Sequence, residues 1–276
     1  MPLRTDPGSL NPDPPNPGQI ELLADRPALV ARAADWVAEQ IAAAVAARGR
    51  CSLVLSGGST PKPLYEALGR RSLPLDQLHL FFGDERYVAP DDPQSNYRMV
   101  REAWLDPAQF PPENVHAMVT EAMVTEAMDP AQAAQIYEAE LRRVLAPASG
   151  DLAPASGELA QPDLPQLDLP QFDIVLLGMG DDGHTASLFP HTPALAVTDA
   201  WVTVGDKNGE PRLTLTLPLL NRARSVIFLV SGASKQPALA QVFSPDAQGS
   251  DYPARLIQPQ GQLLWLMDLD AGKNFR

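Results

Sequence analysis

The sequence predicts an α/β fold, in which a mostly parallel β-sheet is covered by helices on both faces to give three layers. The first observation behind this prediction is that short, continuously apolar runs alternate with helix-like segments along most of the chain. The second is that these runs lack the polar alternation of a half-exposed strand. Strands of this kind belong to sheets buried on both faces, which are usually parallel. The chain, at 276 residues, is long enough to bury such a core.

The first 19 residues do not fit this alternation, because they are rich in proline. These prolines are Pro2, Pro7, Pro12, Pro14, Pro15 and Pro17. Proline lacks a backbone N–H and opposes helix and sheet, so we expect residues 1–19 to be a disordered tail. The predicted catalytic domain, a single α/β unit, spans residues 20–276. It opens with a strand near residues 19–23, after which Asp25 caps a helix that contains Pro27 in its first turn.

Six further apolar runs and four further amphipathic segments complete the predicted fold. The predicted strands are 52–55, 78–82, 172–177, 213–217, 225–230 and 263–267. The predicted helices are 63–68, 96–104, 131–145 and 235–243. Cys51 directly precedes the strand at 52–55, and we interpret it as a small core residue rather than a nucleophile.

Tandem repeats interrupt this pattern between residues 119 and 173. The sequence VTEAM occurs at 119–123 and again at 124–128. LAPASGD at 145–151 is echoed by LAPASGE at 152–158, and LPQLD at 164–168 is echoed by LPQFD at 169–173. Their periods are far too short for a solenoid. We expect a flexible surface insertion near 146–171, and the first repeat could simply lengthen a helix.

Composition narrows the possible partners. The formal net charge of −13 argues against nucleic acid and anionic membranes. No apolar run approaches the roughly 18 residues of a membrane span, and the N-terminus lacks the apolar core of a signal peptide. With one cysteine no internal disulfide can form. We therefore expect a cytoplasmic protein whose partner is a small molecule. The sequence does not reveal the oligomeric state, for which we expect a monomer.

Residues 56–62 (SGGSTPK) follow a predicted strand and precede a predicted helix. Gly57 and Gly58 allow a ligand to approach the backbone, while Ser59, Thr60 and the first helical N–H groups could hold an anion. The GxxxxGK[ST] spacing of a Walker A loop is absent. A glycine turn followed by an ordinary Ser/Thr helix cap is an equally good interpretation of this segment alone.

A second polar segment, residues 82–87 (FGDERY), ends the next strand. In an extended backbone Asp84 and Arg86 share one face and Glu85 points to the other. This pair is either a structural ion pair or a means of positioning an anionic substrate. Ser95 is a predicted helix cap, and Asn96 either binds a ligand or supports the turn.

The third segment, residues 178–190 (GMGDDGHTASLFP), follows the most apolar strand. Its first six residues match GxGxxG, but Asp181 and Asp182 occupy the place of a pyrophosphate, and Pro190 interrupts the helix that should follow. We therefore reject a dinucleotide site. The glycines, including Gly180, instead bend the backbone around a small ligand and project His184 into the site.

Two separated cations, Arg212 and Lys235, form the fourth group. Lys235 again lies between a strand and a helix. Each is either a solvated surface charge or a source of the positive charge that a phosphate pocket needs. No GxSxG or HExxH motif is present, and the four histidines and one cysteine show no metal-site spacing.

Together these segments resemble the 6-phosphogluconolactonase family. The matching pieces, in the family's order, are SGGSTP at 56–61, GDERY at 83–87, SNY at 95–97, GMGDDGHTASLFP at 178–190, PR at 211–212 with residues 213–218, and residues 231–235. Glucosamine-6-phosphate isomerase/deaminase is the nearest alternative, but its corresponding stretches read DEY and DGHIAFNEP. The resemblance implies an α/β/α sandwich of Rossmann-like type, hydrolysis of 6-phospho-D-glucono-1,5-lactone, and no metal or other cofactor.

The resemblance also suggests a role for each candidate residue. His184 is the expected general base for water and later returns the proton to the ring oxygen, with Asp182 orienting the imidazole. Arg86 or backbone N–H groups of the glycine turns would stabilise the oxyanion. Ser59, Thr60, Arg212 and Lys235 would hold the phosphate. A non-catalytic sugar-phosphate sensor is a third possibility, although no basic helix-turn-helix segment is visible.

Overall fold

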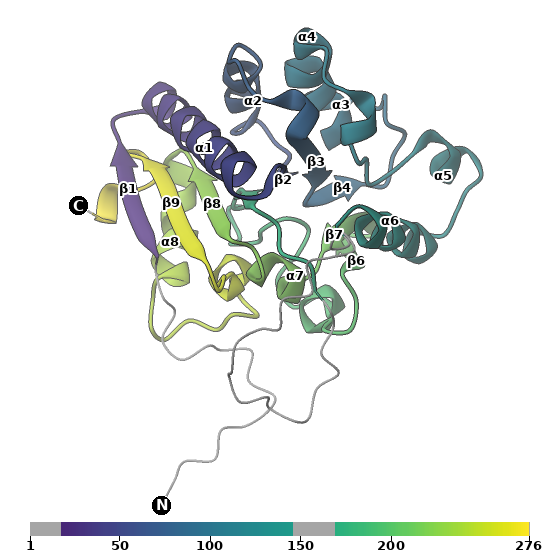
Figure 1. The fold of residues 1–276 in the computed structure, drawn as a ribbon. Helices are drawn as coiled ribbons and strands as arrows, with labels where there is room; N and C mark the ends of the chain where they lie inside the picture. The colour runs from purple at the N-terminus through teal and green to yellow at the C-terminus, as the bar shows by residue number, and fades with distance from the viewer. Residues whose placement is uncertain (1–17, 146–168, 276) are drawn as a thin grey trace, which may run out of the picture.

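The computed structural model describes residues 18–145 and 169–275, and within them a six-stranded parallel sheet forms the centre of the fold (Figure 1). Its strand order is β1-β9-β8-β5-β2-β3, and every neighbouring pair is parallel. The strands are β1 (Gln19–Leu23), β2 (Cys51–Leu55), β3 (Leu78–Phe82), β5 (Ile174–Leu177), β8 (Ser225–Val230) and β9 (Gln262–Asp268). Strands β2, β5 and β8 are buried at every position, which is why they read as continuous apolar runs.

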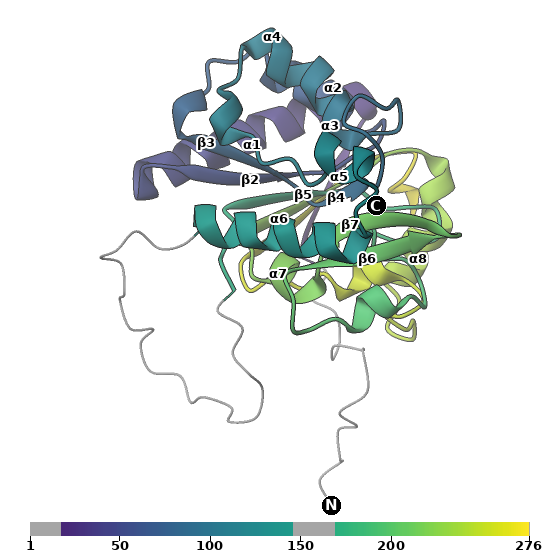
Figure 2. The same cartoon turned by 90° about the vertical axis from the view of Figure 1, so that its right-hand side faces the viewer.

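Helices cover both faces of this sheet, which confirms the predicted three-layer α/β fold (Figure 2). The helices are α1 (Arg26–Arg48), α2 (Lys62–Leu68), α3 (Asn96–Val100), α4 (Asp106–Ala108), α5 (Glu121–Thr125), α6 (Pro130–Leu145), α7 (Leu217–Asn221) and α8 (Gln236–Val242). In Figure 2, α1 to α4 lie above the sheet, and α7 and α8 lie below it. The predicted helix at 96–104 begins as α3 and continues through a π-helical turn at Arg101–Leu105.

Helix α1 begins as the sequence predicts, and a glycine ends it. The Asp25 carboxylate accepts a hydrogen bond of 2.8 Å from the backbone N–H of Ala28, so Asp25 is the N-cap, and Pro27 lies in the first turn. At the other end Gly49 adopts φ +72° and its N–H bonds to the carbonyl of Val45. The inner face of the helix buries Leu29, Ala33, Ala34, Trp36, Val37, Ile41 and Ala44.

One predicted strand was placed in the wrong sheet. Residues 213–217 were expected to join the parallel sheet, but the strand here is β7 (Glu210–Leu215), and Leu217 already begins α7. Strand β7 pairs in antiparallel fashion with β4 (Asp84–Arg86) and β6 (Val202–Lys207) in a separate three-stranded sheet. Helix α6 packs on this small sheet, which the apolar pattern alone did not reveal.

The VTEAM repeat does not lengthen a neighbouring helix, as had been considered possible. Its two copies meet within α5, a short helix of its own that ends before α6 begins. The predicted tail and the predicted insertion at 146–171 lie largely outside the described residues. Within the described residues, no helix combines the length and apolar character needed to cross a bilayer.

The order of the strands determines where a ligand can bind. From β2 the chain moves outward to β3, and it later returns to the other side of β2 through β5 and then β8. Neighbouring connections therefore diverge between β2 and β5, and a crevice opens at the carboxyl ends of the strands, where open parallel sheets bind ligands. Gly83 joins β3 directly to β4, so the small sheet borders this crevice.

Candidate active site

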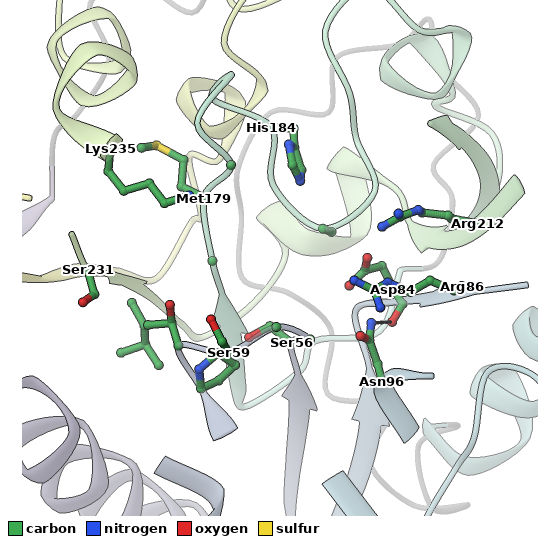
Figure 3. Close-up of a pocket in the computed structure, with 18 residues that line it drawn as sticks. Ser56, Ser59, Asp84, Arg86, Asn96, Met179, His184, Arg212, Ser231 and Lys235 are labelled. Atoms are coloured by element: carbon green, nitrogen blue, oxygen red, sulfur yellow. Dashed lines mark hydrogen bonds between the residues drawn. The ribbon is translucent and has the colours of Figure 1, made fainter. Parts of the chain in front are cut away.

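A cavity of about 260 Å³ lies at the carboxyl ends of β2, β3, β5 and β8, and we call it the carboxyl-end cavity (Figure 3). It brings together residues from all four sequence segments. The predicted residues that line it are Gly57, Gly58, Ser59, Thr60, Asp84, Arg86, Asn96, Gly180, His184, Arg212 and Lys235. Asp182 is the one predicted residue that does not line the cavity, and its carboxylate contacts Nδ1 of His184.

His184 is held by Asp182 in a defined orientation. The imidazole Nδ1 lies 2.5 Å from Oδ1 of Asp182, and the backbone N–H of His184 donates to the same oxygen at 3.1 Å. The hydrogen bond from His184 lowers the pKa of the Asp182 carboxyl to about 2, so that carboxyl is ionised at neutral pH. An ionised carboxylate requires a proton on Nδ1, which leaves the lone pair of a neutral ring on Nε2. Figure 3 shows this ring directed into the cavity.

Gly180 makes this arrangement possible by being small. A Cβ atom at position 180 would lie 2.1 Å from Nδ1 of His184 and 2.5 Å from Oδ1 of Asp182. Any side chain there would separate the histidine from the carboxylate. Gly180 therefore has a structural reason that does not involve a dinucleotide, in agreement with the rejection of the GxGxxG interpretation.

Two arginines face each other across the small sheet beside His184. Arg86 of β4 and Arg212 of β7 are directly opposed in the antiparallel register. Both have a buried Nε without a hydrogen-bond partner within the described structure. Burial first, and then the neighbouring Arg86 guanidinium, lower the pKa of Arg212. Like charges at opposed positions destabilise a sheet, so this pair favours an anion between or beside the two guanidinium groups.

Asp84 does not form an ion pair with Arg86 within the described structure, which removes one of the two interpretations of that pair. Its carboxylate instead accepts a 2.7 Å hydrogen bond from the hydroxyl of Ser187, and its backbone carbonyl accepts one from Asn96. The side chain is buried yet borders the cavity. A carboxylate beside two arginines can accept a hydrogen bond from a substrate hydroxyl.

Glu85 points away from the cavity and organises the segment after it. Its carboxylate accepts hydrogen bonds from the backbone N–H groups of Asn96 and Tyr97 and from the hydroxyl of Ser95. Ser95 in turn caps α3 by accepting from the N–H of Arg98 at 3.1 Å. The predicted alternation of Asp84, Glu85 and Arg86 is thus observed, and Glu85 belongs to the scaffold.

The loop at 56–61 lacks the ordinary helix cap that was its alternative interpretation. Pro61 is the N-cap residue of α2, and no side chain accepts a capping hydrogen bond there. Ser59 and Thr60 are therefore not used by the helix, and both line the cavity. Gly57 packs against Asn96 so closely that a Cβ would lie 2.0 Å from the amide oxygen, which joins this loop to the start of α3.

Lys235 and Arg212 approach the cavity from two different sides (Figure 3). The ammonium group of Lys235 lies 2.7 Å from Oδ1 of Asp181 and is only one-fifth exposed. The hydrogen bond to Lys235 is the main cause that lowers the pKa of Asp181. The two adjacent aspartates of the GMGDDGH segment are thereby separated in role, since Asp181 contacts the lysine and Asp182 contacts the histidine.

Sequence reasoning missed several residues of this cavity. The missed lining residues are Ser56, Pro61, Gly178, Met179, Ala186, Leu229 and Ser231. The hydroxyl of Ser56 is buried without a partner in the described structure, and Ala186 has φ +48°, which is unusual for a residue with a side chain. Ser56 and Ser231 each directly follow a predicted strand, and that position was the available signal. No group of three or more potential ligands among the described residues is placed to hold a metal ion.

A parallel sheet that carries a histidine–aspartate pair and several cations around one cavity defines an enzyme for a small anionic substrate. The family of glucosamine-6-phosphate isomerases/6-phosphogluconolactonase matches residues 24–265, and the chain belongs to it. A curated 6-phosphogluconolactonase of Synechocystis is 52% identical, with 94% of this chain and 98% of the relative covered. That of Mycobacterium tuberculosis is 37% identical, with 91% and 96% covered.

Solved structures agree with this assignment. The 6-phosphogluconolactonase of Trypanosoma brucei aligns with a TM-score of 0.75 at 30% identity, and 94% of this chain and 99% of that chain are covered. The relatives match over nearly their whole length, so the similarity extends over nearly the whole of this chain.

Proposed function

We propose that this chain hydrolyses 6-phospho-D-glucono-1,5-lactone to 6-phospho-D-gluconate, the second step of the oxidative pentose phosphate pathway. The observation that carries the proposal is His184, whose Nδ1 is bound to Asp182 at 2.5 Å while the ring faces a cavity lined by cations. A base of this kind activates water, and the cations match the two anionic groups of the reaction, the phosphate and the developing oxyanion. The relatives named 6-phosphogluconolactonase support the same activity.

In the proposed reaction, Nε2 of His184 takes a proton from a water molecule as the water oxygen attacks the lactone carbonyl carbon. The carbonyl becomes an oxyanion, which Arg86 or a backbone N–H of the glycine turns stabilises. The bond between the carbonyl carbon and the ring oxygen then breaks, and His184 returns the proton to that oxygen. Asp182 stabilises the positively charged imidazole between the two transfers.

The phosphate would lie between Lys235 and Arg212, which enter the cavity from its two sides. Ser59 and Thr60, together with the backbone at Gly57 and Gly58, complete the proposed phosphate site. Asp84 and Asn96 would contact the hydroxyl groups of the sugar. Fixing the phosphate in this way holds the lactone carbonyl against His184, and such positioning lowers the barrier by removing rotational and translational freedom in advance.

We further propose that residues 20–276 act as a single catalytic domain, as a monomer, in the cytoplasm and without a nucleic-acid partner. The only exposed large hydrophobic side chain in the described part of the chain is Ile136, so that part offers no broad apolar surface for a second subunit. The net charge of −13 disfavours nucleic acid. Cys51, the single cysteine, is buried and unpaired, which suits a reducing compartment.

The test is to follow acid release from freshly generated 6-phosphogluconolactone, relative to its spontaneous hydrolysis, with glucosamine 6-phosphate as a second substrate. We expect acid release to accelerate with added protein and no ammonia to form from the amino sugar. Ammonia release would identify an isomerase/deaminase instead. Binding of sugar phosphates without turnover would identify a sensor.

A further inference from the structure

A second cavity lies at the opposite ends of the same strands, and we call it the amino-end cavity. Its volume is about 210 Å³. Its walls come from residues at or near the first positions of β2, β3, β5 and β8, from the last residues of α1 and α6, and from Pro170 and Gln171. Neither the sequence motifs nor the proposed hydrolysis makes use of it. Strand β2 has five residues, so the two cavities are separated by about 16 Å of sheet.

Three guanidinium groups surround this cavity. Arg48 ends α1, Arg50 precedes β2, and Arg224 precedes β8. The side chains of Arg48 and Arg224 are 38% and 44% exposed, so their remaining N–H groups can reach a ligand. Arg50 donates to the backbone carbonyl of Val144 and forms no ion pair within the described residues. Such a concentration of positive charge contrasts with a chain whose net charge is −13.

Asp173 is the one carboxylate that lines the cavity among the described residues, and its two oxygens are already occupied. Oδ1 lies 2.7 Å from Arg48 and 3.4 Å from Arg224. Oδ2 accepts hydrogen bonds from the backbone N–H and the hydroxyl of Ser52. The carboxylate thus fixes two of the arginines in place and neutralises one of the three positive charges. Two positive charges remain, which match a dianion.

His79 of β3 adds a proton acceptor to the same cavity. Its Nδ1 lies 3.2 Å from Nε2 of His116, and Nδ1 of His116 lies 2.9 Å from the Glu140 carboxylate. Glu140 can only accept when ionised, so neutral His116 carries its proton on Nδ1 and neutral His79 donates from Nδ1. The lone pair of His79 is therefore on Nε2, where a bound anion would favour protonation.

We propose that the amino-end cavity binds a phosphoryl dianion, either inorganic phosphate or a small phosphate monoester. Arg50 is its principal ligand, and Arg48 and Arg224, held by Asp173, contribute further N–H groups. Planar guanidinium groups bind phosphoryl oxygens through paired N–H donors, which a cluster of three can provide from several directions. This site is separate from the carboxyl-end cavity and does not depend on the reaction proposed there.

Cys51 supplies a local reporter for the test. It is the only cysteine of the chain, it lines the amino-end cavity, and it is fully buried. A neutral reagent such as iodoacetamide can reach it only when the cavity opens, so a bound anion should slow alkylation. The full-length protein is titrated with inorganic phosphate in one arm and glycerol 3-phosphate in the other, with sodium chloride at equal ionic strength as a control. Mass spectrometry follows the alkylation rate.

We expect one or both phosphoryl compounds, but not chloride, to slow alkylation of Cys51. Arg50→Gln should raise the concentration needed for half-protection by about 10-fold or more, because it removes charged hydrogen bonds. Arg222→Gln is the matched control, since Arg222 is two positions from the cavity residue Arg224 but lies outside the cavity and donates to Gln260. Both variants should keep the wild-type kcat and KM for the lactone.

Equal protection in wild type and Arg50→Gln would overturn the proposal, because binding in the carboxyl-end cavity could then explain the slowing. Absence of protection by either compound would overturn it as well. Circular dichroism checks that each variant is folded. If Arg50→Gln does not fold, Arg224→Gln replaces it with the same expected result, since Arg48 still holds Asp173 in that variant. An inactive wild-type protein would refute the hydrolysis but would leave this test valid.

Discussion

The carboxyl-end and amino-end cavities lie at opposite ends of β2, β3, β5 and β8, yet they are built in different ways. The carboxyl-end cavity is formed by loops with glycines at close contacts, and it contains buried polar atoms that have no partner among the described residues, such as Nε of Arg86 and Arg212. In the amino-end cavity, Asp173 and Ser52 form a connected polar network at the strand starts. The carboxyl-end cavity thus suits a substrate whose charge distribution changes during a reaction, whereas the amino-end cavity suits an anion whose charge stays the same.

The largest difference between the two ends should appear in turnover. His184→Ala removes the proposed base, and we expect kcat for lactone hydrolysis to fall by about 10²- to 10⁴-fold while KM changes little. His191→Ala is the matched control, because the His191 side chain is exposed and pairs with Asp251 at the surface. Stopped-flow or pH-indicator kinetics on fresh lactone measure both variants. Near-wild-type kcat in His184→Ala would remove His184 from the base role.

Replacement of one of the two opposed arginines, Arg86 and Arg212, should weaken substrate binding without lowering the stability of the fold. Arg212→Gln deletes one proposed phosphate ligand, so KM should rise by about 10- to 100-fold. The same change relieves the repulsion from Arg86 and the burial of a charge, so the Tm of the unliganded protein should be unchanged or higher. Steady-state kinetics and calorimetry test this. A lower Tm together with an unchanged KM would show that Arg212 is structural.

The adjacent aspartates of the same loop should have opposite effects. Asp182→Asn weakens the support of the imidazole, and because the carboxylate is about half exposed we expect a kcat loss of only about 10-fold. Asp181→Asn instead frees Lys235 from its 2.7 Å ion pair, so KM should fall and kcat should stay the same. The two variants serve as controls for each other. A kcat loss in Asp181→Asn equal to that in Asp182→Asn would contradict the separation of roles.

The smallest expected effect is the contribution of His79, in the amino-end cavity, to the pH dependence of the unfolding free energy. Burial, then the neighbouring His116 and Arg50, lower the pKa of His79. As the pH falls below about 6.5, His79 therefore takes up a proton in the unfolded chain before it does so in the folded chain. The contribution of His79 to stability is complete above that pH. It is lost as the pH falls toward the lower pKa of the folded state.

His79→Gln should accordingly reduce the loss of unfolding free energy between pH 7.5 and pH 5.5, as measured by urea denaturation. His191→Gln, at an exposed position, provides the control. An equal pH dependence in wild type and His79→Gln would show that His79 titrates alike in the folded and unfolded chains.

The parallel sheet and most of the carboxyl-end cavity could be predicted because each left a local pattern. The fully buried strands read as apolar runs, and the polar residues that follow them mark the cavity. The antiparallel sheet left no such pattern, since β4 has three residues and β6 has a mixed sequence, VTVGDK. Strands β4 and β6 both pair with β7, and only the tertiary fold brings these three strands together.

The partners of individual side chains could not be predicted from the sequence either. Asp181 and Lys235 are 54 positions apart and form an ion pair only because β5 and β8 are neighbours. Arg50, His79 and Arg224 are likewise scattered along the chain, and parallel pairing alone places the strand starts beside one another. Local patterns therefore revealed the carboxyl ends of the strands, which carry glycines and recognisable motifs. They missed the amino ends, whose residues belong to no motif.

The pairing of β1 with β9 has a consequence for biosynthesis. Gln19, in the first strand of the chain, is in register with Leu264, in the last. Strand β9 is the only sheet neighbour of β1 in the described structure. A ribosome that adds about 5–20 residues per second needs roughly 12–50 s to make the chain between them. During that time β1 has no partner, so the sheet can be completed only near the end of synthesis, and nascent chains that stop before β9 expose an unpaired strand to chaperones and proteases.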